Sequence, residues 1–516
     1  MRSTNPGGAD GAAARDEWPV LARRIRQLGV AVFTALLLMW PAAMNGQPFF
    51  FYDSVDYLHE ANVGLAKLSA GRLADDWSEA QDVNRAMRSS AAGELLPHSP
   101  GATKRPPPAG RSIYYGVLAD ITAMVSGLWG IAALQSLAAG ALLSLVYECF
   151  ALRLGAQLAV SSAVAACTAL ALFCDFIMPD IWVGLALAAL ATQLAFPRKV
   201  SRGEAAFLGA FVCYGALAHA SVILSLSIVL ALTAGAMLRR RVIARANGAS
   251  PAGANTCQAG LRRAFVVCAA ALAVGMAGAA VFEQVTQRAI GNAPVMPPFL
   301  TARVIEDGAG ARYLAEHCRP ARFDACRYAD RRFASAEDYL WGPRSPLASA
   351  TAEQRRRLSA EDAAFAATVV SRYPLSQAGA SARNALRQLL TIDISIVNYE
   401  PRELAWFAQA APARVMAVLR STPSAHGAWP TEALKLVEQA AILGVCVSMA
   451  LVWGRLPVEH RRFFTAALAI CVVNAIVCGA TSGVWGRYEA RVAWLVCVAG
   501  FCALAALCQR RRQAEP

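Results

Sequence analysis

The chain has 516 residues, of which 56% are hydrophobic and only 16% are charged. A soluble protein carries about a quarter charged residues, and the apolar residues here fall in blocks of about 17–25, the length that a helix needs to cross a bilayer. The net charge of +14 does not indicate a nucleic-acid-binding protein, because the basic residues cluster at the ends of apolar runs and form no stripe interleaved with aromatic side chains. Composition therefore predicts an all-α polytopic membrane protein.

Basic clusters mark the cytoplasmic ends of the predicted membrane spans, as the positive-inside rule requires. With these clusters inside, about ten helices alternate across the membrane, both termini are cytoplasmic, and the first span is a retained signal anchor. The clusters lie at 23–26, 198–202, 239–241, 262–263 and 510–512. The predicted spans lie near 27–44, 128–150, 156–174, 180–196, 204–219, 221–238, 264–282, 434–453, 462–480 and 490–508.

Residues 113–127, "IYYGVLADITAMVSG", are apolar enough to extend the span that follows them. A second crossing here would place Arg153 outside and break the alternation of basic clusters. We therefore favour an interfacial or re-entrant helix on the outer side over a further crossing. That depth suits Asp120 and the tyrosine pair.

Two outer segments interrupt the membrane regions, which are predicted at 1–282 and 434–516. The first outer loop, 45–112, is polar and ends in a Pro/Gly-rich stretch. The second segment, 283–433, is long enough for a small domain, and its apolar residues recur at spacings of three and four, which is typical of helices. We therefore expect a mainly helical extracytoplasmic domain inserted before the last three spans.

Most of the 14 cysteines lie inside apolar runs, where a thiol behaves as a small hydrophobic group. Cys318 and Cys326, in "CRPARFDAC", lie instead in an outer segment. An oxidising compartment favours a disulfide between them. Two free thiols are the alternative, and a metal site is disfavoured because no histidine stands nearby at ligand spacing.

Charged residues are nearly absent from the middle of the predicted spans and gather at their outer ends. Asp53 and Asp56 follow the first span in "YDSVDYL". Further turns on the same side supply other polar side chains, a grouping in which a carboxylate can act as a general base and an arginine can bind phosphate in bidentate fashion. These side chains are Asp175 and Asp180 in "CDFIMPD", His219 in "LAHASV", and Arg487, Tyr488, Glu489 and Arg491 in "VWGRYEARVAW".

Each of these residues also has a purely structural interpretation. An aspartate at a helix end can be an N-cap or a solvated charge, and a histidine in a turn is more often structural than a ligand. Arginines at the end of a span can extend to lipid headgroups. The functional interpretation gains weight because all of these residues are predicted on one side of the membrane.

This pattern resembles the membrane-embedded C-class glycosyltransferases, the GT-C superfamily. The resemblance rests on "YDSVDYL" after the first span, on Asp175 and Asp180 in the next outer turn, and on "GRYEAR" before the last span. It covers the membrane core and leaves most of 283–433 unaccounted for. The superfamily often has two adjacent acids in its first loop, whereas Ser54 and Val55 separate the two aspartates here.

The resemblance implies a transferase that moves a sugar from a polyprenyl-phosphate donor to an envelope glycan, lipid or protein on the outer side of the bacterial cytoplasmic membrane. It implies that Asp53 deprotonates the acceptor, that Asp56 tunes Asp53 or binds the acceptor, and that Arg487 neutralises the leaving phosphate. The outer domain would select the acceptor, and a divalent metal is compatible with the pattern without being required by it. The residues implied in substrate binding are Asp175, Asp180, His219, Arg487, Tyr488 and Arg491.

Two other classes of protein share this hydropathy. A lipid or glycan transporter would have interrupted helices and a polar path through the bundle, which the sequence does not display. A non-catalytic assembly or sensor protein would use its outer domain to bind a partner.

Overall fold

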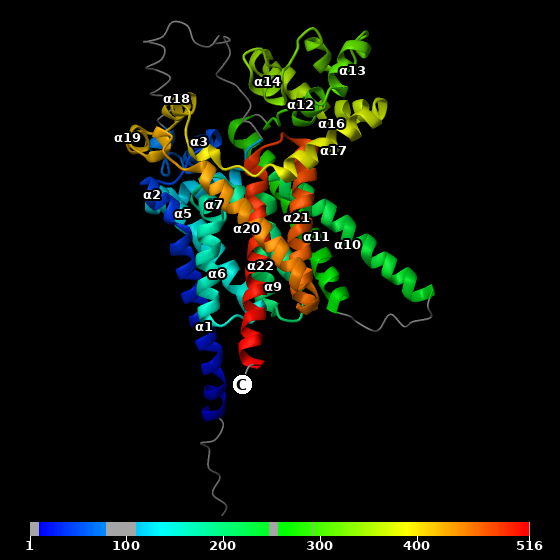
Figure 1. Cartoon of the computed structure of the whole chain (residues 1–516). Helices are drawn as coiled ribbons and strands as arrows, with labels where there is room; N and C mark the ends of the chain where they lie inside the picture. The colour runs from blue at the N-terminus through cyan, green and yellow to red at the C-terminus, as the bar shows by residue number, and fades with distance from the viewer. Residues whose placement is uncertain (1–9, 79–109, 247–255, 292, 515–516) are drawn as a thin grey trace, which may run out of the picture.

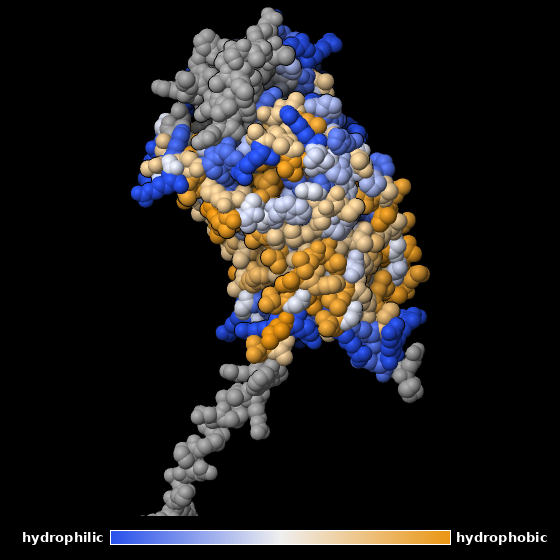
Figure 2. All heavy atoms as spheres, turned by 90° about the vertical axis from the view of Figure 1, so that its left-hand side faces the viewer, coloured by the Kyte–Doolittle hydropathy of each residue, from blue (hydrophilic) through white to orange (hydrophobic). Residues whose placement is uncertain are grey.

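The computed structural model describes residues 10–78, 110–246, 256–291 and 293–514, and these residues form an all-helical protein without strands. Within the described ranges, seven stretches are long and apolar enough to cross a membrane. They are Leu21–Asn45, Ile113–Cys149, Ala220–Ile243, Gln258–Ala289, Thr431–Arg455, Val458–Thr481 and Gly486–Gln513. Figure 2 shows, on one face of the molecule, a band of hydrophobic side chains between two hydrophilic ends, as expected of a protein embedded in a bilayer.

Seven long stretches do not confirm the expected number of about ten spans. Three predicted spans correspond to shorter helices of 14, 16 and 17 residues, namely α6 (Leu154–Cys167), α8 (Asp180–Ala195) and α9 (Arg202–Ala218). A crossing perpendicular to the membrane takes about 20 residues. The predicted span 156–174 is also interrupted, because α6 ends at Cys167 and α7 (Leu170–Asp175) begins after a break.

The membrane bundle is built from these short helices and from the long ones shown in Figure 1. Helix α8 lies at its centre, with every side chain from Asp180 to Thr192 buried. Such a helix, apolar all round, needs protein on all sides. The long helices are α1 (Asp10–Leu38), α5 (Ile113–Cys149), α10 (Ala220–Ala246), α11 (Thr256–Ile290), α20 (Thr431–Val452), α21 (Val458–Thr481) and α22 (Gly486–Ala514).

One end of the bundle carries the basic clusters. Helix α1 begins and α22 ends there, on the side opposite the outer helices (Figure 1). Arg26 pairs with Glu148 at 2.8 Å, and Lys199 pairs with Glu459 at 3.1 Å. Residues from four separate segments therefore meet at the end that the sequence predicts to be cytoplasmic.

The segment 113–127 is the first arm of α5. Gly127 has φ 68°, a left-handed conformation that glycine adopts without a steric penalty, and it divides this arm from the rest of the helix. The arm packs against α3 (Tyr52–Leu68), where Asn62 donates a 3.0 Å hydrogen bond to the buried Asp120. Asp120 is thus fully covered by protein rather than lying at an exposed membrane surface.

The segment 283–433 contributes to two hydrophobic cores. One core lies within residues 302–369, where Phe365 and Tyr339 are fully buried and a disulfide joins Cys318 to Cys326 with Cα atoms 5.3 Å apart. Residues 394–429 belong instead to the core of the membrane bundle. The helices of the first core are α12 (Phe299–Glu306), α13 (Ala309–His317), α14 (Ala336–Trp341), α15 (Pro346–Ser349) and α16 (Ala352–Arg372). Those of the remainder are α17 (Pro374–Leu390), α18 (Pro401–Ala410) and α19 (Ala413–Leu419).

A single backbone bridge fixes the entry to α3. After α2 (Trp40–Asn45), the chain at Phe49 pairs in parallel with Phe176, just beyond α7. The amide of Phe49 donates to the carbonyl of Asp175 at 2.9 Å, and the amide of Ile177 donates to the carbonyl of Phe49 at 3.0 Å. The first outer loop is thereby held against the turn that precedes α8.

Candidate functional site

Helix α3 begins directly behind the aromatic block and carries both aspartates of "YDSVDYL". Phe51 is its N-cap residue, and the amide of Phe51 donates to the hydroxyl of Ser54 at 2.8 Å. Asp53 lies in the first turn, where the positive end of the helix dipole favours a carboxylate. Asp56 follows three residues later and therefore shares its face of the helix.

Arg111 connects the acids on this face. Its Nε and Nη2 both donate to Oδ1 of Asp53, at 3.0 and 2.8 Å, and Nη2 also lies 2.8 Å from Oδ2 of Asp56. Glu60, one turn further along α3, lies 3.7 Å from Nη1 of the same guanidinium. One arginine thus partly neutralises three carboxylates, and among the described residues no hydrogen bond is donated to Oδ2 of Asp53.

The two aspartates differ in their environment. The side chain of Asp53 is 30% exposed, whereas that of Asp56 is 11% exposed. Burial raises the pKa of Asp56 to about 6, with Arg111 acting in the opposite direction and Asp53 adding to the rise. Asp53 is therefore the more accessible carboxylate, and the pKa of Asp56 is raised toward neutral pH by burial.

A second charged group lies at the start of α22. Arg491 is fully buried, and its Nη1 donates to Oδ1 of Asp180 at 2.9 Å. Its Nη2 donates to the hydroxyl of Ser221 at 3.1 Å and to the side-chain carbonyl of Asn474 at 3.2 Å. These contacts join α22 to α8, α10 and α21, as a buried charge requires both a counter-ion and further hydrogen-bond partners.

His219 and Tyr488 adjoin this pair. Nε2 of His219, the residue that ends α9, lies 3.3 Å from Nη1 of Arg491, and the guanidinium carbon of Arg491 lies 4.8 Å from the centre of the Tyr488 ring. Asn474 donates to the backbone carbonyl of Tyr488 at 2.6 Å and to the carboxylate of Glu489 at 3.1 Å. The predicted residues Asp180, His219, Tyr488 and Arg491 therefore lie together.

Arg487 differs from Arg491 because two of its guanidinium nitrogens, Nε and Nη1, lack a close acceptor among the described residues. Its side chain is 12% exposed, and Nη1 is 3.9 Å from Oδ2 of Asp180, beyond hydrogen-bonding distance. Nε and Nη1 are both buried, and no described residue accepts a hydrogen bond from either. Its guanidinium carbon instead lies 4.1 Å from the centre of the Phe51 ring and 5.0 Å from that of Tyr488.

Arg487 also connects the two charged groups. Phe51, on which it stacks, is the N-cap of the helix that carries Asp53. The buried phenol of Tyr57 lies near charges of both groups, and burial raises its pKa well above its ordinary value. The charges of Asp53, Arg111, Asp180 and Arg487 all act on this phenol. The two groups are therefore close enough to be treated as one site, which we call the rim site.

Asp175 lies apart from the rim site. Its carboxylate accepts a 2.6 Å hydrogen bond from the amide of Ala42 in α2, and the side chain is fully buried. The turn containing Pro179 separates it from Asp180, so the two aspartates of "CDFIMPD" face different neighbours. The carboxylate of Asp175 anchors α2, which leads into the first outer loop, and this contact gives it a structural role.

Several residues of the rim site were not foreseen from the sequence. Glu60 could have been found from its spacing, because residues 53, 56 and 60 share one helical face. Arg111 carries no such signal, since its partners lie more than 50 residues earlier in the chain. Ser221 and Asn474 are polar residues within apolar helices, and only their contacts with Arg491 mark them.

No metal site is found among the described residues, since no three histidine, cysteine, aspartate or glutamate side chains are grouped as one requires. In the acidic face of α3, the position between the carboxylates is taken by Arg111. Comparison of the chain with protein families, with curated proteins and with solved structures finds no match.

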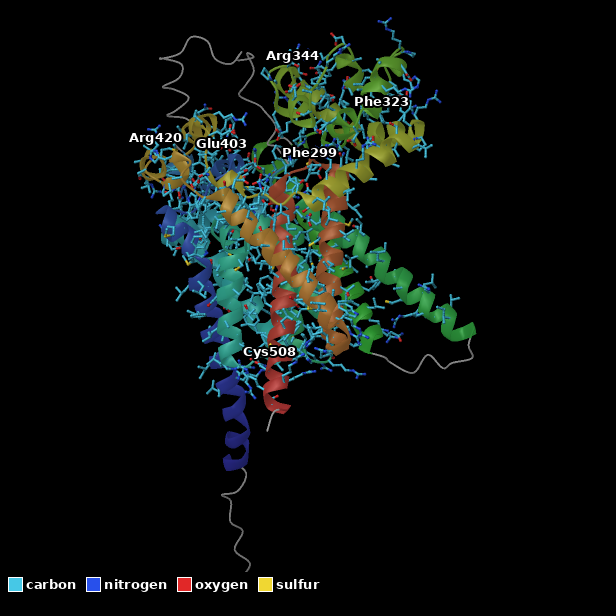
Figure 3. The ribbon with its side chains drawn as sticks, viewed as in Figure 1. Phe299, Phe323, Arg344, Glu403, Arg420 and Cys508 are labelled. Atoms are coloured by element: carbon cyan, nitrogen blue, oxygen red, sulfur yellow. A yellow bond between two sulfur atoms is a disulfide. The ribbon has the colours of Figure 1, made fainter. Side chains whose placement is uncertain are left out.

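The outer helices carry a separate basic hollow of ≈ 700 Å³. Arg331 is fixed there, because its Nη1 donates to the backbone carbonyl of Arg344 at 2.7 Å and its guanidinium carbon lies 4.9 Å from the centre of the Tyr328 ring. Arg344 lies at the tip of the outer helices in Figure 3. The residues lining the hollow are Asp330, Arg331, Arg332, Pro343, Arg344 and Ser349.

Proposed function

We propose that the chain is a membrane glycosyltransferase that moves a sugar from a polyprenyl-phosphate donor to an acceptor on the outer side of the membrane. The support comes from the chemistry of the rim site, where two guanidinium nitrogens of Arg487 have no acceptor among the described residues and the neighbouring helix α3 carries three acidic side chains. Such a site suits a reaction in which a phosphate leaves while a hydroxyl loses its proton.

The observation that carries this proposal is the state of Arg487. Its Nε and Nη1 are buried without an acceptor among the described residues, which is costly because each unmade hydrogen bond of a buried group loses about 1–3 kcal/mol. A phosphate brings several acceptor oxygens and a negative charge, and arginine binds it in bidentate fashion. The donor phosphate is therefore the ligand that we assign to Arg487.

Asp53 is the base in this proposal. Both hydrogen bonds from Arg111 end on Oδ1, so Oδ2 is the oxygen that remains for an acceptor hydroxyl. Arg111 fixes the orientation of the carboxylate, and Asp56 shares the same guanidinium. When Asp53 takes up a proton and loses its charge, the guanidinium of Arg111 remains paired with Asp56.

Arg491 has a supporting role. Its guanidinium is fully buried and already bonded to Asp180, Ser221 and Asn474. It orients the first turn of α22, and thereby Arg487, one turn earlier in the same helix. We therefore assign phosphate binding to Arg487 alone.

The basic hollow of the outer helices suits an acceptor that bears carboxylate or phosphate groups. The hollow lies on the outer domain, to which the rim site assigns no role. Envelope glycans, lipids and proteins all include acidic members, and three arginines would favour those members over neutral ones.

The test is a transfer assay with the purified chain in liposomes that contain polyprenyl-phosphate sugars, read by mass spectrometry of the products. Asp53→Asn should lower the rate by about 10²–10⁴-fold, which is the contribution of a general base. Arg487→Ala should in addition raise the donor concentration needed for half-maximal rate. The matched control is Arg420→Ala, because Arg420 is an exposed arginine at the end of α19 (Figure 3).

Wild-type transfer by Asp53→Asn would show that Asp53 is not the base. Wild-type donor dependence in Arg487→Ala would remove the phosphate assignment. If the wild-type chain transfers no sugar from any polyprenyl-phosphate donor, while binding a labelled glycan through its outer helices, it belongs to the class of assembly or sensor proteins.

A further inference from the structure

Helix α17 turns its polar side inward. Gln377 and Asn384 donate to the carboxylate of Asp307 at 2.6 and 2.8 Å. Gln388 and Trp485 exchange two hydrogen bonds of 2.9 Å, one from the glutamine amide to the backbone carbonyl and one from the backbone amide to the glutamine oxygen. Residues 377, 384 and 388 lie on one helical face, so the inward face of α17 carries three amide side chains.

The opposite face of α17 is apolar and uncovered. The exposed fractions of Leu375, Leu386 and Leu390 are 87%, 58% and 72%. A helix whose outer face meets water has the reverse arrangement, with apolar residues inward and polar residues outward. The outward leucines therefore indicate surroundings that are not water.

The position of α17 identifies those surroundings. It packs on α21, whose Gly479 lies in the last turn of a membrane-spanning stretch. A Cβ atom at Gly479 would lie 2.7 Å from the backbone of Asn384 and Ala385, so the two helix backbones are in direct contact. Figure 1 shows α17 across the top of the bundle, beneath the helices of the outer domain. The end of a membrane-spanning stretch is where the hydrocarbon core is expected to meet the lipid headgroups.

We propose that α17 lies in the outer leaflet of the membrane as an interfacial helix, with Leu375, Leu386 and Leu390 among the upper acyl chains. Such helices bury an apolar face about 5–10 Å into the boundary between headgroups and chains. The exposed Arg383 and Arg387 flank the leucines and face the lipid phosphates. The partner of this surface is the lipid of the leaflet itself, and the inference does not depend on the proposed catalytic activity.

The placement of α17 fixes the depth of the rim site. The two hydrogen bonds of Gln388 hold the backbone of Trp485, two residues before Arg487. A helix that rests on the headgroup layer thereby holds the guanidinium of Arg487 at the same level. That level is where the phosphate of any lipid-linked molecule resides.

The test uses the full chain in phosphatidylcholine liposomes with an environment-sensitive fluorescent amino acid placed at position 386. Lipids that carry a nitroxide high on the acyl chain should quench this fluorophore, and iodide in the buffer should leave it unquenched. The matched control is the same amino acid at position 344, which lies on the outer domain and should be quenched by iodide alone. Position 375, the most exposed of the three leucines, gives an independent second measurement.

Quenching of both leucine positions by iodide and not by nitroxide lipid would overturn the proposal. The basic flank is tested separately with the double variant Arg383→Gln and Arg387→Gln. In liposomes that contain anionic lipid, the amount of that lipid retained on the purified chain, measured by mass spectrometry, should fall relative to wild type. Equal retention would remove the assignment of these arginines to lipid phosphates.

Discussion

The guanidinium of Arg487 stacks on the ring of Phe51, with 4.1 Å between the guanidinium carbon and the ring centre. The two residues are 436 positions apart in the chain (487 − 51), yet this contact joins the last membrane helix to the first outer helix. A cation over an aromatic face contributes about 0.5–2 kcal/mol, more when both groups are shielded from water. It holds the guanidinium while leaving its N–H groups available to an anion.

This contact predicts a selective effect of the Phe51 ring. Phe51→Leu keeps an apolar side chain but removes the aromatic face, so it should lower the unfolding temperature and weaken donor binding together. Phe51→Tyr keeps the face and is the matched control, expected to behave as wild type. Thermal unfolding in detergent and donor titration check both variants. Equal behaviour of the leucine and tyrosine variants would contradict a role for the aromatic ring.

Asp56 predicts a component of the pH dependence of stability. Burial raises its pKa from 3.8 to about 6, so the folded protein holds this proton more tightly than the unfolded chain. The free energy of unfolding should therefore decrease as the pH rises from about 4 to about 6, by about 1.4 kcal/mol for each pKa unit. Asp56→Asn cannot ionise and should lack this decrease.

The measurement is the unfolding temperature in detergent between pH 4 and pH 7 for wild type and Asp56→Asn. Other carboxyl groups titrate in both proteins, so the difference between the two curves isolates Asp56. The difference should favour the variant increasingly as the pH rises. Parallel curves would show that the pKa of Asp56 is not raised in the folded protein.

The buried pair of Asp180 and Arg491 predicts strong coupling between α8 and α22. Asp180→Asn leaves the charge of Arg491 without its counter-ion, and breaking a buried pair in this way costs about 3–5 kcal/mol. The double variant Asp180→Leu and Arg491→Met removes both charges and should recover much of the loss. Thermal unfolding of the single and double variants measures the coupling. If the double variant is no more stable than Asp180→Asn, the two charges do not stabilise each other.

Cys508 offers a native probe of the topology. It is the one free cysteine classed as exposed among those described, and it lies at the end of α22 beside the basic residues 510–512 (Figure 3). Cys257, whose side chain lies outside the described part of the structure, is replaced by serine so that it cannot contribute label. In this background a membrane-impermeant maleimide should label Cys508 only after the cells are permeabilised. Arg344→Cys in the outer domain is the control and should react from outside. Labelling of Cys508 in intact cells would reverse the topology.

The sequence predicts the helical membrane class and much of the rim site for physical reasons that are visible in short stretches. Apolar blocks of membrane length identify spans, and a spacing of three residues places Asp53 and Asp56 on one face. Asp180 and Arg491 were expected on the same side because basic clusters fix the direction of each span. Their direct 2.9 Å contact agrees with that expectation.

Other features depend on contacts between residues far apart in the chain, which no short stretch of the sequence reveals. Arg111 stands at the end of a Pro/Gly-rich stretch, where periodicity gives no information about its partners. Asp175 was grouped with Asp180 because only a short turn separates them, but the turn points the two carboxylates at different helices. The helical pattern of α17 is apparent in the sequence, whereas the orientation of its apolar face emerges only from the amides that hold the other face.

The parallel bridge between Phe49 and Phe176 has a consequence for how such a protein can diverge. The entry to α3 is held by two backbone hydrogen bonds, at 2.9 and 3.0 Å, and these bonds do not depend on the identity of the side chains involved. Related proteins can therefore exchange the residues at 49 and 176 for other extended, bulky ones while keeping the first outer helix in register. Substitutions that accumulate there will repack the core around the bridge without moving the acids that follow.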